Sequence, residues 1–324
     1  MNPAEGDGPG IEAAYATAAA IMQSRAVSFH QAFSQLPATR FRGVAALYAF
    51  CRHADDLVDQ ADGGAAIDRA LLALDELEAD VRRLGAAGTS GRAALDGDGR
   101  EALPWWPAFA ATVHRHQIPI DSFLRQIEGQ RMDAGLHDID TVEHLLDYCR
   151  LVAGSVGVMM LPLLADDTTD VRDPKLIKAC EDLGVGMQIT NILRDVREDL
   201  RLRNRVYLPA DLRSRHGVFR SSLESLAAEQ TDGGGKMQIP RSFIALWEEL
   251  AALAEPYYHA YEGWIGAFHP GCRVPLAAAA LSYRAIADAV RDAAHDCFTR
   301  RGYTSAQTRA QCLAQARQLV AQAL

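Results

Sequence analysis

The sequence carries fewer positive than negative charges, and this shortage restricts its partners. Its 33 Lys and Arg residues stand against 42 Asp and Glu, which gives a formal net charge of −9 over 324 residues. A negative overall field repels phosphate, so indiscriminate binding to nucleic acid or to anionic lipid is disfavoured. We therefore expect no nucleic-acid partner.

The chain also lacks the marks of metal-ribbon, disulfide-rich and membrane-spanning proteins. Its six cysteines are scattered and form no CxxC pair, which argues against a zinc ribbon or a disulfide framework. Its first residues show no basic stretch followed by an apolar one, so no secretory signal is visible. The longest apolar run, 151–165, contains two glycines and a proline and falls short of the roughly 20 residues that span a bilayer. We expect a cytoplasmic protein.

Strand-like patterns are nearly missing. Alternating β-branched runs are rare, whereas Ala, Leu, Arg, Glu and Gln dominate, and this composition is typical of helices. The pattern predicts a single all-α domain over 1–324, with residues 1–10 disordered and flexible loops at 85–104 and 231–238. The expected helices cover 11–27, 40–60, 64–85, 105–117, 121–135, 141–164, 174–202, 240–268, 272–299 and 304–323.

A first acidic cluster, DDLVD, ends the expected helix 40–60. Asp55 and Asp59 are four residues apart, so they lie on one helical face. Arg52 precedes them on the same side, and Asp56 sits beside them. Two like charges one turn apart destabilise a helix by a few tenths of a kcal/mol unless a cation neutralises them.

A second acidic cluster lies in QITNILRDVREDL. Gln188, Asn191, Asp195 and Asp199 follow one another at spacings of three, four and four, which predicts one polar stripe. Arg194 flanks this stripe. Carboxylate and amide oxygens are the ligands that Mg²⁺ prefers. An acidic pair is usually a solvated helix face, but both clusters follow mostly apolar segments. We expect the two clusters to face each other across a helical bundle and to bind Mg²⁺.

Four segments of the sequence resemble the squalene/phytoene synthase family of head-to-head prenyl synthases. These segments are SFHQAFSQLP (28–37), YAFCRHADDLVD (48–59), YCRLVAGSVGVMMLPLL (148–164) and GVGMQITNILRDVREDLRLRNRVYLP (184–209). The C-terminal third matches more loosely, through the helix that begins near Tyr283 and through FTRR at 298–301. The resemblance implies one large helical bundle of the isoprenoid synthase type with a central cavity.

The resemblance also assigns roles to particular residues. It implies a magnesium-dependent prenyltransferase that condenses two prenyl diphosphates through a presqualene-type cyclopropyl diphosphate. The implied metal ligands are Asp55, Asp59, Asn191, Asp195 and Asp199, with Asp56 in support. The implied catalytic and substrate-binding residues are Arg52, Tyr48, Ser28, Phe29, Phe33, Tyr148, Val152, Ala153, Gln188, Asn191 and Arg194. Mg²⁺ is the expected cofactor, and NADPH is the less favoured alternative. An oily product leaves peripheral membrane contact open, and the oligomeric state is not indicated.

The length of the substrate is the finer question. Phe33 lies one turn beyond Phe29 on the same face, where a bulky ring would shorten the space for a prenyl tail. Segments of this form, with a phenylalanine at that position, resemble the C15-using dehydrosqualene synthases more than typical C20-using phytoene synthases. We therefore expect farnesyl diphosphate as the substrate and a C30 product, dehydrosqualene. The alternatives are phytoene from geranylgeranyl diphosphate, squalene or presqualene diphosphate for a hopanoid pathway, and a non-catalytic helical assembly factor. His295 stands where many relatives have a tyrosine tied to the later steps, so its role is left open.

Overall fold

The computed structural model describes residues 9–59, 61, 63–86, 103–229 and 237–324 of the chain. Within these residues the backbone forms helices and two isolated bridges, Asp138 with Val206 and Ala165 with Phe268. The expectation of an all-α fold is confirmed. The predicted disorder at 1–10 and the predicted loops at 85–104 and 231–238 fall almost entirely outside the described residues.

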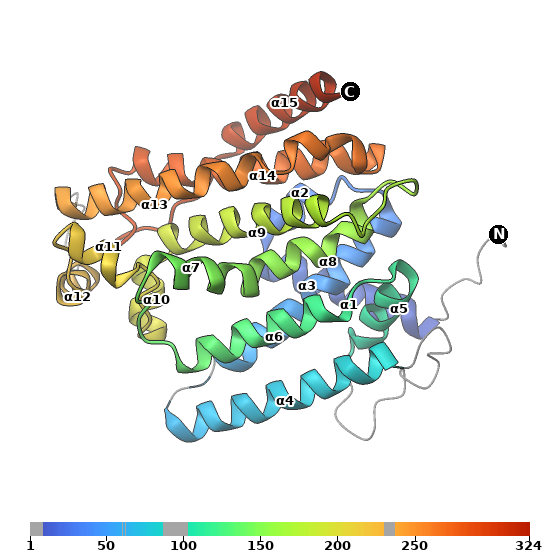
Figure 1. Ribbon diagram of the computed structural model, residues 1–324, viewed down its shortest axis with the longest axis horizontal. Coiled ribbons are helices and arrows are strands. Elements are labelled where there is room, and N and C mark those ends of the chain that lie inside the picture. Colours follow the sequence, from blue (N-terminus) through green and yellow to red (C-terminus); the bar gives the residue numbers. More distant parts are fainter. Residues whose placement is uncertain (1–8, 60, 62, 87–102, 230–236) are drawn as a thin grey trace.

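The elements follow one another in a mostly antiparallel bundle (Figure 1). They are α1 (Pro9–Arg25), α2 (Val27–Phe33), α3 (Ala38–Asp59), α4 (Gly64–Ala86), α5 (Trp106–His116), α6 (Ile120–Gly135), α7 (Val142–Cys149), the π-helix η2 (Arg150–Gly154), α8 (Ser155–Leu164), α9 (Pro174–Arg194), α10 (Val196–Arg203), α11 (Ala210–Arg215), α12 (Arg220–Ala228), α13 (Arg241–His259), the 3-10 helix η3 (Glu262–Ala267), α14 (Pro270–Asp292) and α15 (Ala306–Ala323).

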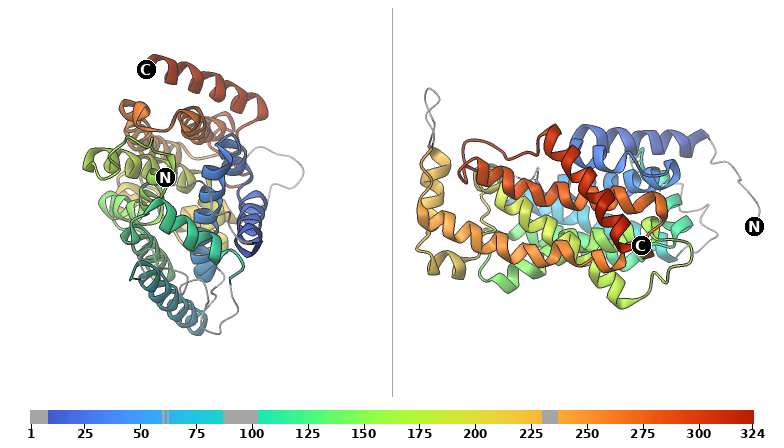
Figure 2. Two further views of the ribbon diagram at one scale, coloured as in Figure 1. Left: turned by 90° about the vertical axis from the view of Figure 1, so that its right-hand side faces the viewer. Right: turned by 90° about the horizontal axis from the view of Figure 1, so that it is seen from above.

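The long helices stack from α4 through α6, α8 and α9 to α13 and α14 (Figure 1). Helix α3 packs behind this stack, against α1, α5, α6 and α8. Helix α15 lies on the outside, on α14 (Figure 2). The three short helices α10, α11 and α12 gather at one end of the bundle. The fold therefore brings the end of α3 and the end of α9 towards the same region.

Helices α8 and α9 approach at backbone distance, which requires glycine at their contact. A Cβ on Gly157 would lie 2.1 Å from the carbonyl oxygen of Cys180, and one on Gly184 would lie 2.2 Å from that of Ala153. Ala153 belongs to η2, where one wide turn interrupts the α-helical ladder. Such single π-turns are found frequently at functional sites. This contact fixes α9, and hence the second acidic cluster, against η2.

Several predicted boundaries differ from the structure. The expected helix 174–202 is interrupted at Asp195, whose φ of −104° and ψ of 17° separate α9 from α10. The backbone N–H of Asp195 still donates to Asn191, and that of Asp199 to Asp195, so the polar stripe continues through the break. The expected helix 272–299 ends at Asp292, because Ala294 and His295 adopt positive φ. Helices α11 and α12 were not predicted.

One stretch of the described residues, Val142–Leu164, is long and apolar enough to cross a membrane by length and composition alone. It comprises α7, η2 and α8, and it packs against α6 and α9 inside the bundle. Core helices pass the same test, so this stretch gives weak evidence for a membrane span.

Candidate functional site

The first acidic cluster lies at the end of α3, where an arginine already binds two of its three carboxylates. Arg52 donates to Asp55 over 2.8 Å and also pairs with Asp56. The Nε of Arg52 is buried and has no hydrogen-bond partner. Burial and the neighbouring Asp59 raise the pKa of Asp55 to about 7. Tyr48 is half-buried one turn before Arg52, and burial raises its pKa to about 12.

Asp59 is held by two arginines, one on each carboxylate oxygen. Arg203 lies 2.8 Å from its Oδ2, and Arg205 lies 3.0 Å from its Oδ1. The two arginines flank Asn204, whose φ of 55° ends α10 in the left-handed conformation that asparagine tolerates. This turn directs both guanidinium groups towards the end of α3. No pattern in the sequence indicates this role for either arginine.

The second acidic cluster is paired in a similar way. Arg194 donates to both oxygens of Asp195, over 2.7 and 2.5 Å, and Arg301 donates to the same two oxygens over 2.8 Å each. Burial opposes ionisation of Asp195, but these two arginines lower its pKa below the ordinary value. Arg301 comes from the segment after α14 and also lies 3.5 Å from Glu198.

The two acidic clusters face each other, as the sequence predicted. Arg203 lies 2.8 Å from Asp59 on α3 and 3.1 Å from Asp199 on α10. Burial raises the pKa of Asp199 to about 8, against the lowering effect of Arg203. Arg203 therefore does not fully offset the cost of burying the charged form of Asp199.

One amide oxygen of the polar stripe has no hydrogen-bond partner. Asn191 donates to the Oε1 of Gln188 over 3.2 Å, so its own Oδ1 is free to accept. That Oδ1 is buried and has no hydrogen-bond partner. A buried unsatisfied acceptor costs about 1–3 kcal/mol unless a ligand meets it.

A buried hydrogen-bond network adjoins the clusters. Tyr148 donates to one oxygen of Asp133 over 2.9 Å, and Tyr207 donates to the other over 2.7 Å. The two tyrosine rings stack with centroids 5.0 Å apart. Arg205 donates weakly to Tyr207 over 3.4 Å, which connects the network to Asp59.

Only Tyr148 of this network was predicted. Asp133 could have been found from a polar stripe on α6, because Gln126, Gln130 and Asp133 recur at helical spacing and all three are buried. Tyr207 lies in the YLP block of the sequence, but no pattern at that position indicates its contact with Asp133.

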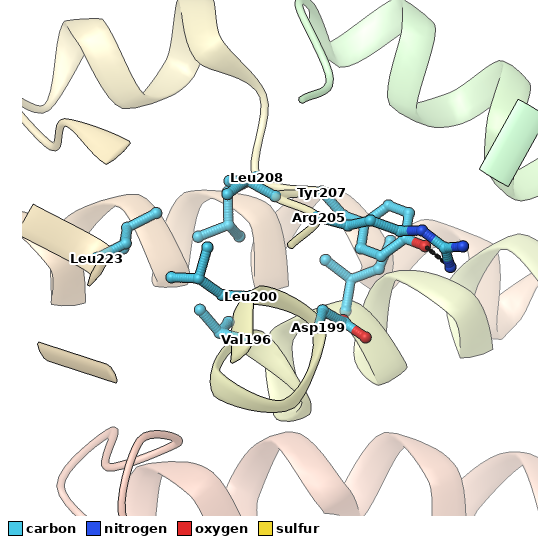
Figure 3. A pocket seen from close by; sticks show the side chains of 9 residues that line it. Val196, Asp199, Leu200, Arg205, Tyr207, Leu208 and Leu223 are labelled. Atoms are coloured by element: carbon cyan, nitrogen blue, oxygen red, sulfur yellow. Dashed lines mark hydrogen bonds between the residues drawn. The ribbon is translucent and has the colours of Figure 1, made fainter. Parts of the chain in front are cut away.

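The side chains of α10 and its following segment separate into a polar and an apolar group. Figure 3 shows Asp199, Arg205 and Tyr207 directed to one side of a small cavity, whereas Val196, Leu200, Leu208 and Leu223 close the other. The cavity has a volume of about 10 Å³, which is room for about one water molecule. The apolar group anchors α10, and the polar group faces the acidic clusters.

The predicted apolar lining residues lie on three elements. Phe29 and Phe33 of α2 are in edge contact, with centroids 4.4 Å apart, and Phe29 lies 6.1 Å from Tyr48. Phe33 is fully buried and Phe29 is partly buried, so Phe33 lies deeper, as expected. Val152 and Ala153 are half-buried in η2. The side chain of Ser28 lies outside the described residues.

His295 and Tyr283, near the C-terminal end of the sequence match, lie in different surroundings. The ring of His295 accepts or donates a hydrogen bond with Glu248 over 2.7 Å and packs edge-on against Trp247. These partners lie on α13, so His295 has a structural role in joining α14 to α13. Tyr283 on α14 is half-buried, and desolvation raises its pKa, against the lowering effect of Arg194.

Comparisons with known proteins agree with this arrangement. The profile of the squalene/phytoene synthase family matches residues 22–310. A phytoene synthase of Thermus thermophilus is 33% identical over 91% of this chain and 90% of its own length. A 15-cis-phytoene synthase of a Paracoccus species is 36% identical over 80% of this chain and 76% of its own.

Solved structures of related proteins have a similar fold. The crystal structure of a dehydrosqualene synthase superposes with a TM-score of 0.79 and 31% identity, over 96% of this chain and 98% of that one. A squalene synthase from Alicyclobacillus acidocaldarius has a TM-score of 0.70 and 22% identity, over 88% of this chain and 95% of its own, which shows a common fold.

Proposed function

The chain belongs to the squalene/phytoene synthase family, whose members are prenyltransferases that join two prenyl diphosphates head to head, and on this premise we propose that it makes a C30 hydrocarbon from two molecules of farnesyl diphosphate. The observation that carries the choice of substrate is the buried ring of Phe33 behind Phe29. This ring occupies space that a longer prenyl tail would need.

The oxygen-rich donor set fits divalent metal. Asn191 offers an unpartnered buried oxygen, and burial disfavours the charged forms of Asp55 and Asp199, which a bound cation would stabilise. As arranged, no three His, Cys, Asp or Glu side chains of the described residues could hold an ion together, because Asp59 and Asp195 face arginines. Rotation of Arg203 would free one oxygen of Asp59, and release of Asp195 would require both Arg194 and Arg301 to rotate away.

Mg²⁺ is the proposed cofactor, and Asp55, Asp59, Asn191, Asp195 and Asp199 would hold it. When bound, it supplies positive charge that stabilises the departing diphosphate. Arg52 contributes a buried Nε–H without a partner, which suits a diphosphate oxygen. Arg194, which is half-buried and pairs with Asp195, presents a second guanidinium at the end of α9. These fixed donors require little reorganisation when the allylic diphosphate ionises.

The surrounding residues would orient the substrates and exclude water. Asp133 accepts hydrogen bonds from both tyrosine hydroxyls, so the oxygens of Tyr148 and Tyr207 are held in place as acceptors. Phe29 and Phe33 would supply an apolar wall without nucleophiles. Beside such a wall, the carbocation formed from one substrate survives until the double bond of the second substrate attacks it. We propose that the prenyl channel passes these rings and Val152 and Ala153 of η2.

A second candidate is phytoene synthesis from geranylgeranyl diphosphate. The curated relatives described above are named phytoene synthases, which favours this candidate. The two candidate reactions differ in the length of the prenyl chain of the substrate and share the chemistry of condensation. The same condensation could also end in squalene, if NADPH supplies a hydride, or stop at presqualene diphosphate.

Product analysis tests the proposal. The purified protein is incubated with Mg²⁺ and either farnesyl or geranylgeranyl diphosphate, with and without NADPH, and the hydrocarbon is identified. We expect dehydrosqualene from farnesyl diphosphate without NADPH. A C40 product alone would replace the proposal with phytoene synthesis, and squalene formed only with NADPH would replace deprotonation with hydride transfer.

The metal site is tested by substitution. Asp55→Asn and Asp195→Asn should each lower turnover by at least about 100-fold at ordinary Mg²⁺ concentration. Asp75→Asn is the matched control, because Asp75 is exposed on α4 and pairs with Arg131. Full turnover in either of the first two variants would rule out the proposed metal ligands. We also propose a cytoplasmic location with peripheral membrane contact. Sedimentation of the unchanged protein with lipid vesicles would test this membrane contact.

A further inference from the structure

A larger cavity opens beside the acidic clusters, on the outer side of α10. It has a volume of about 360 Å³ and lies between the end of α9, the helix α10 and residues 297–301. Figure 1 places α10 at one end of the bundle. Five arginines line the cavity, namely Arg194, Arg197, Arg201, Arg300 and Arg301, together with two carboxylates. We refer to it as the basic cavity.

The positive charge of the basic cavity exceeds its negative charge. Arg194 and Arg301 are paired with Asp195, and Arg301 also lies 3.5 Å from Glu198. These two arginines and two carboxylates balance one another. Of the other three arginines, Arg300 lies 3.9 Å from Asp296, and Arg197 and Arg201 line the same cavity without an ion pair to its two carboxylates.

Two of these three arginines are held in place by the backbone. Arg197 and Arg201 both donate to the carbonyl oxygen of Ala227 at the end of α12, over 3.3 and 3.1 Å. Each bond uses one of the five N–H groups of a guanidinium, so most donors stay available for an acceptor in the cavity. Like charges four residues apart on a helix repel each other, and a bound anion would remove that repulsion.

We propose that the basic cavity is a binding site for a phosphate-class anion, either a phosphate or a diphosphate group, and that it works without metal. Several arginines around one hollow are the donor set that recognises phosphate oxygens. The site goes beyond the proposed condensation, since it requires neither Mg²⁺ nor a prenyl tail. Asp195 and Arg301 both line the basic cavity, so the anion would lie next to the second acidic cluster.

Two sources could supply this anion. One is free inorganic phosphate or diphosphate in solution, including the diphosphate that the condensation releases. The other is the headgroup of a phospholipid, because two exposed side chains beside the cavity, Leu202 and Tyr303, could contact a lipid surface. Leu202 lines the cavity, and the Tyr303 ring lies 5.8 Å from the Arg301 guanidinium. Both sources present the same phosphate oxygens to the arginines.

Calorimetric titration of the full chain with inorganic diphosphate in EDTA tests the site. The double variant Arg197→Gln/Arg201→Gln should bind diphosphate at least about tenfold more weakly than the unchanged protein. The variant Arg197→Lys/Arg201→Lys should retain most of the affinity, because it keeps the charge. The control Arg82→Gln/Arg83→Gln removes two exposed arginines from α4 and should bind as the unchanged protein does.

A second arm separates the two sources. The same four proteins are sedimented with neutral phosphatidylcholine vesicles and with vesicles that contain phosphatidylglycerol. Diphosphate binding that depends on Arg197 and Arg201 supports the free anion, and dependence seen only with the anionic vesicles supports the headgroup. Equal binding by all four proteins in both arms overturns the proposal, and so does an equal loss in the α4 control, which would show only a general effect of net charge.

The test is independent of the proposed condensation. Asp59→Asn should lose turnover but bind diphosphate in EDTA at least as well as the unchanged protein, because it removes a negative charge outside the basic cavity. Circular dichroism and thermal unfolding of Arg197→Gln/Arg201→Gln establish that the variant is folded before its affinity is compared.

Discussion

Arg203 donates to Asp59 over 2.8 Å, and this ion pair joins the two halves of the candidate site. The same guanidinium lies 3.1 Å from Asp199 on its own helix. A positive charge of the protein thus stands between carboxylates that the proposed function assigns to metal. Burial disfavours the charged form of Arg203, but these carboxylates raise its pKa above the ordinary value, so it stays protonated.

Replacement of Arg203 should destabilise the metal-free protein. Arg203→Gln leaves Asp59 and Asp199 without their shared cation, and we expect a loss of about 1–3 kcal/mol in the free energy of unfolding in EDTA. Mg²⁺ without substrate should then raise the melting temperature of this variant more than that of the unchanged protein. Thermal unfolding at graded Mg²⁺ concentration measures both effects.

Arg203→Lys is the matched control, because it keeps the charge and should behave nearly as the unchanged protein does. An identical response to Mg²⁺ in all three proteins would show that Arg203 does not compete with metal at this position.

Asp133 should make stability depend on pH. Burial raises its pKa to about 6, against the lowering effects of Arg205 and the two tyrosine hydroxyls. The folded protein therefore holds this proton more tightly than the unfolded chain, whose ordinary value is 3.8. The contribution to stability is fully present below that value and is lost as pH rises through about 6. Denaturant unfolding in EDTA at intervals from pH 4.5 to 7.5 measures this slope.

Asp133→Asn removes the titrating group and keeps the shape of the side chain. Its unfolding free energy should fall less steeply over the same pH range. If the two slopes coincide, another group causes the pH dependence.

The sequence predicted the part of the site that depends on helical periodicity. Asp55 and Asp59, and the stripe from Gln188 to Asp199, follow from spacings of three and four residues, which fix the face of a helix. That these clusters meet was inferred from their apolar surroundings, and Arg203 confirms it by contacting both. The long core helices were predicted for the same reason.

The missed residues depend on local turns and on contacts between distant segments. Arg203 and Arg205 reach Asp59 because Asn204 adopts a positive φ, and no periodicity reports this turn. Arg301 reaches Asp195 because α14 ends at Asp292 and the chain turns through Ala294 and His295. The predicted continuation of that helix to residue 299 would have directed Arg301 elsewhere.

The close contact of η2 with α9 should be sensitive to one methyl group. Gly184→Ala would bring a Cβ within 2.2 Å of the Ala153 carbonyl oxygen, so α9 must move. We expect a loss of about 1–3 kcal/mol in unfolding free energy and lower turnover, because Gln188 and Asn191 lie one and two turns further along α9. Denaturant midpoints and steady-state rates measure the two effects.

Gly135→Ala provides the comparison, since a Cβ at that position in α6 meets nothing within 4 Å. It should be neutral or stabilising by a few tenths of a kcal/mol. Equal stability of the two variants would mean that α9 can shift without cost.

Phe33 should control the length of the product. Phe33→Leu and Phe33→Ala progressively empty the space beyond Phe29, so the share of C40 product from an equimolar mixture of farnesyl and geranylgeranyl diphosphates should rise in that order. Phe33→Ala should also cost about 3–5 kcal/mol of stability, because the ring is fully buried, and Phe33→Leu keeps the test interpretable if the alanine variant unfolds.

Phe109→Leu is the control, because Phe109 is equally buried but stacks on Phe50 of α3 in the core. It should lower stability without changing the product ratio. If the Phe33 variants lose stability and keep the product ratio of the unchanged protein, Phe33 is an ordinary core residue and substrate length is set elsewhere.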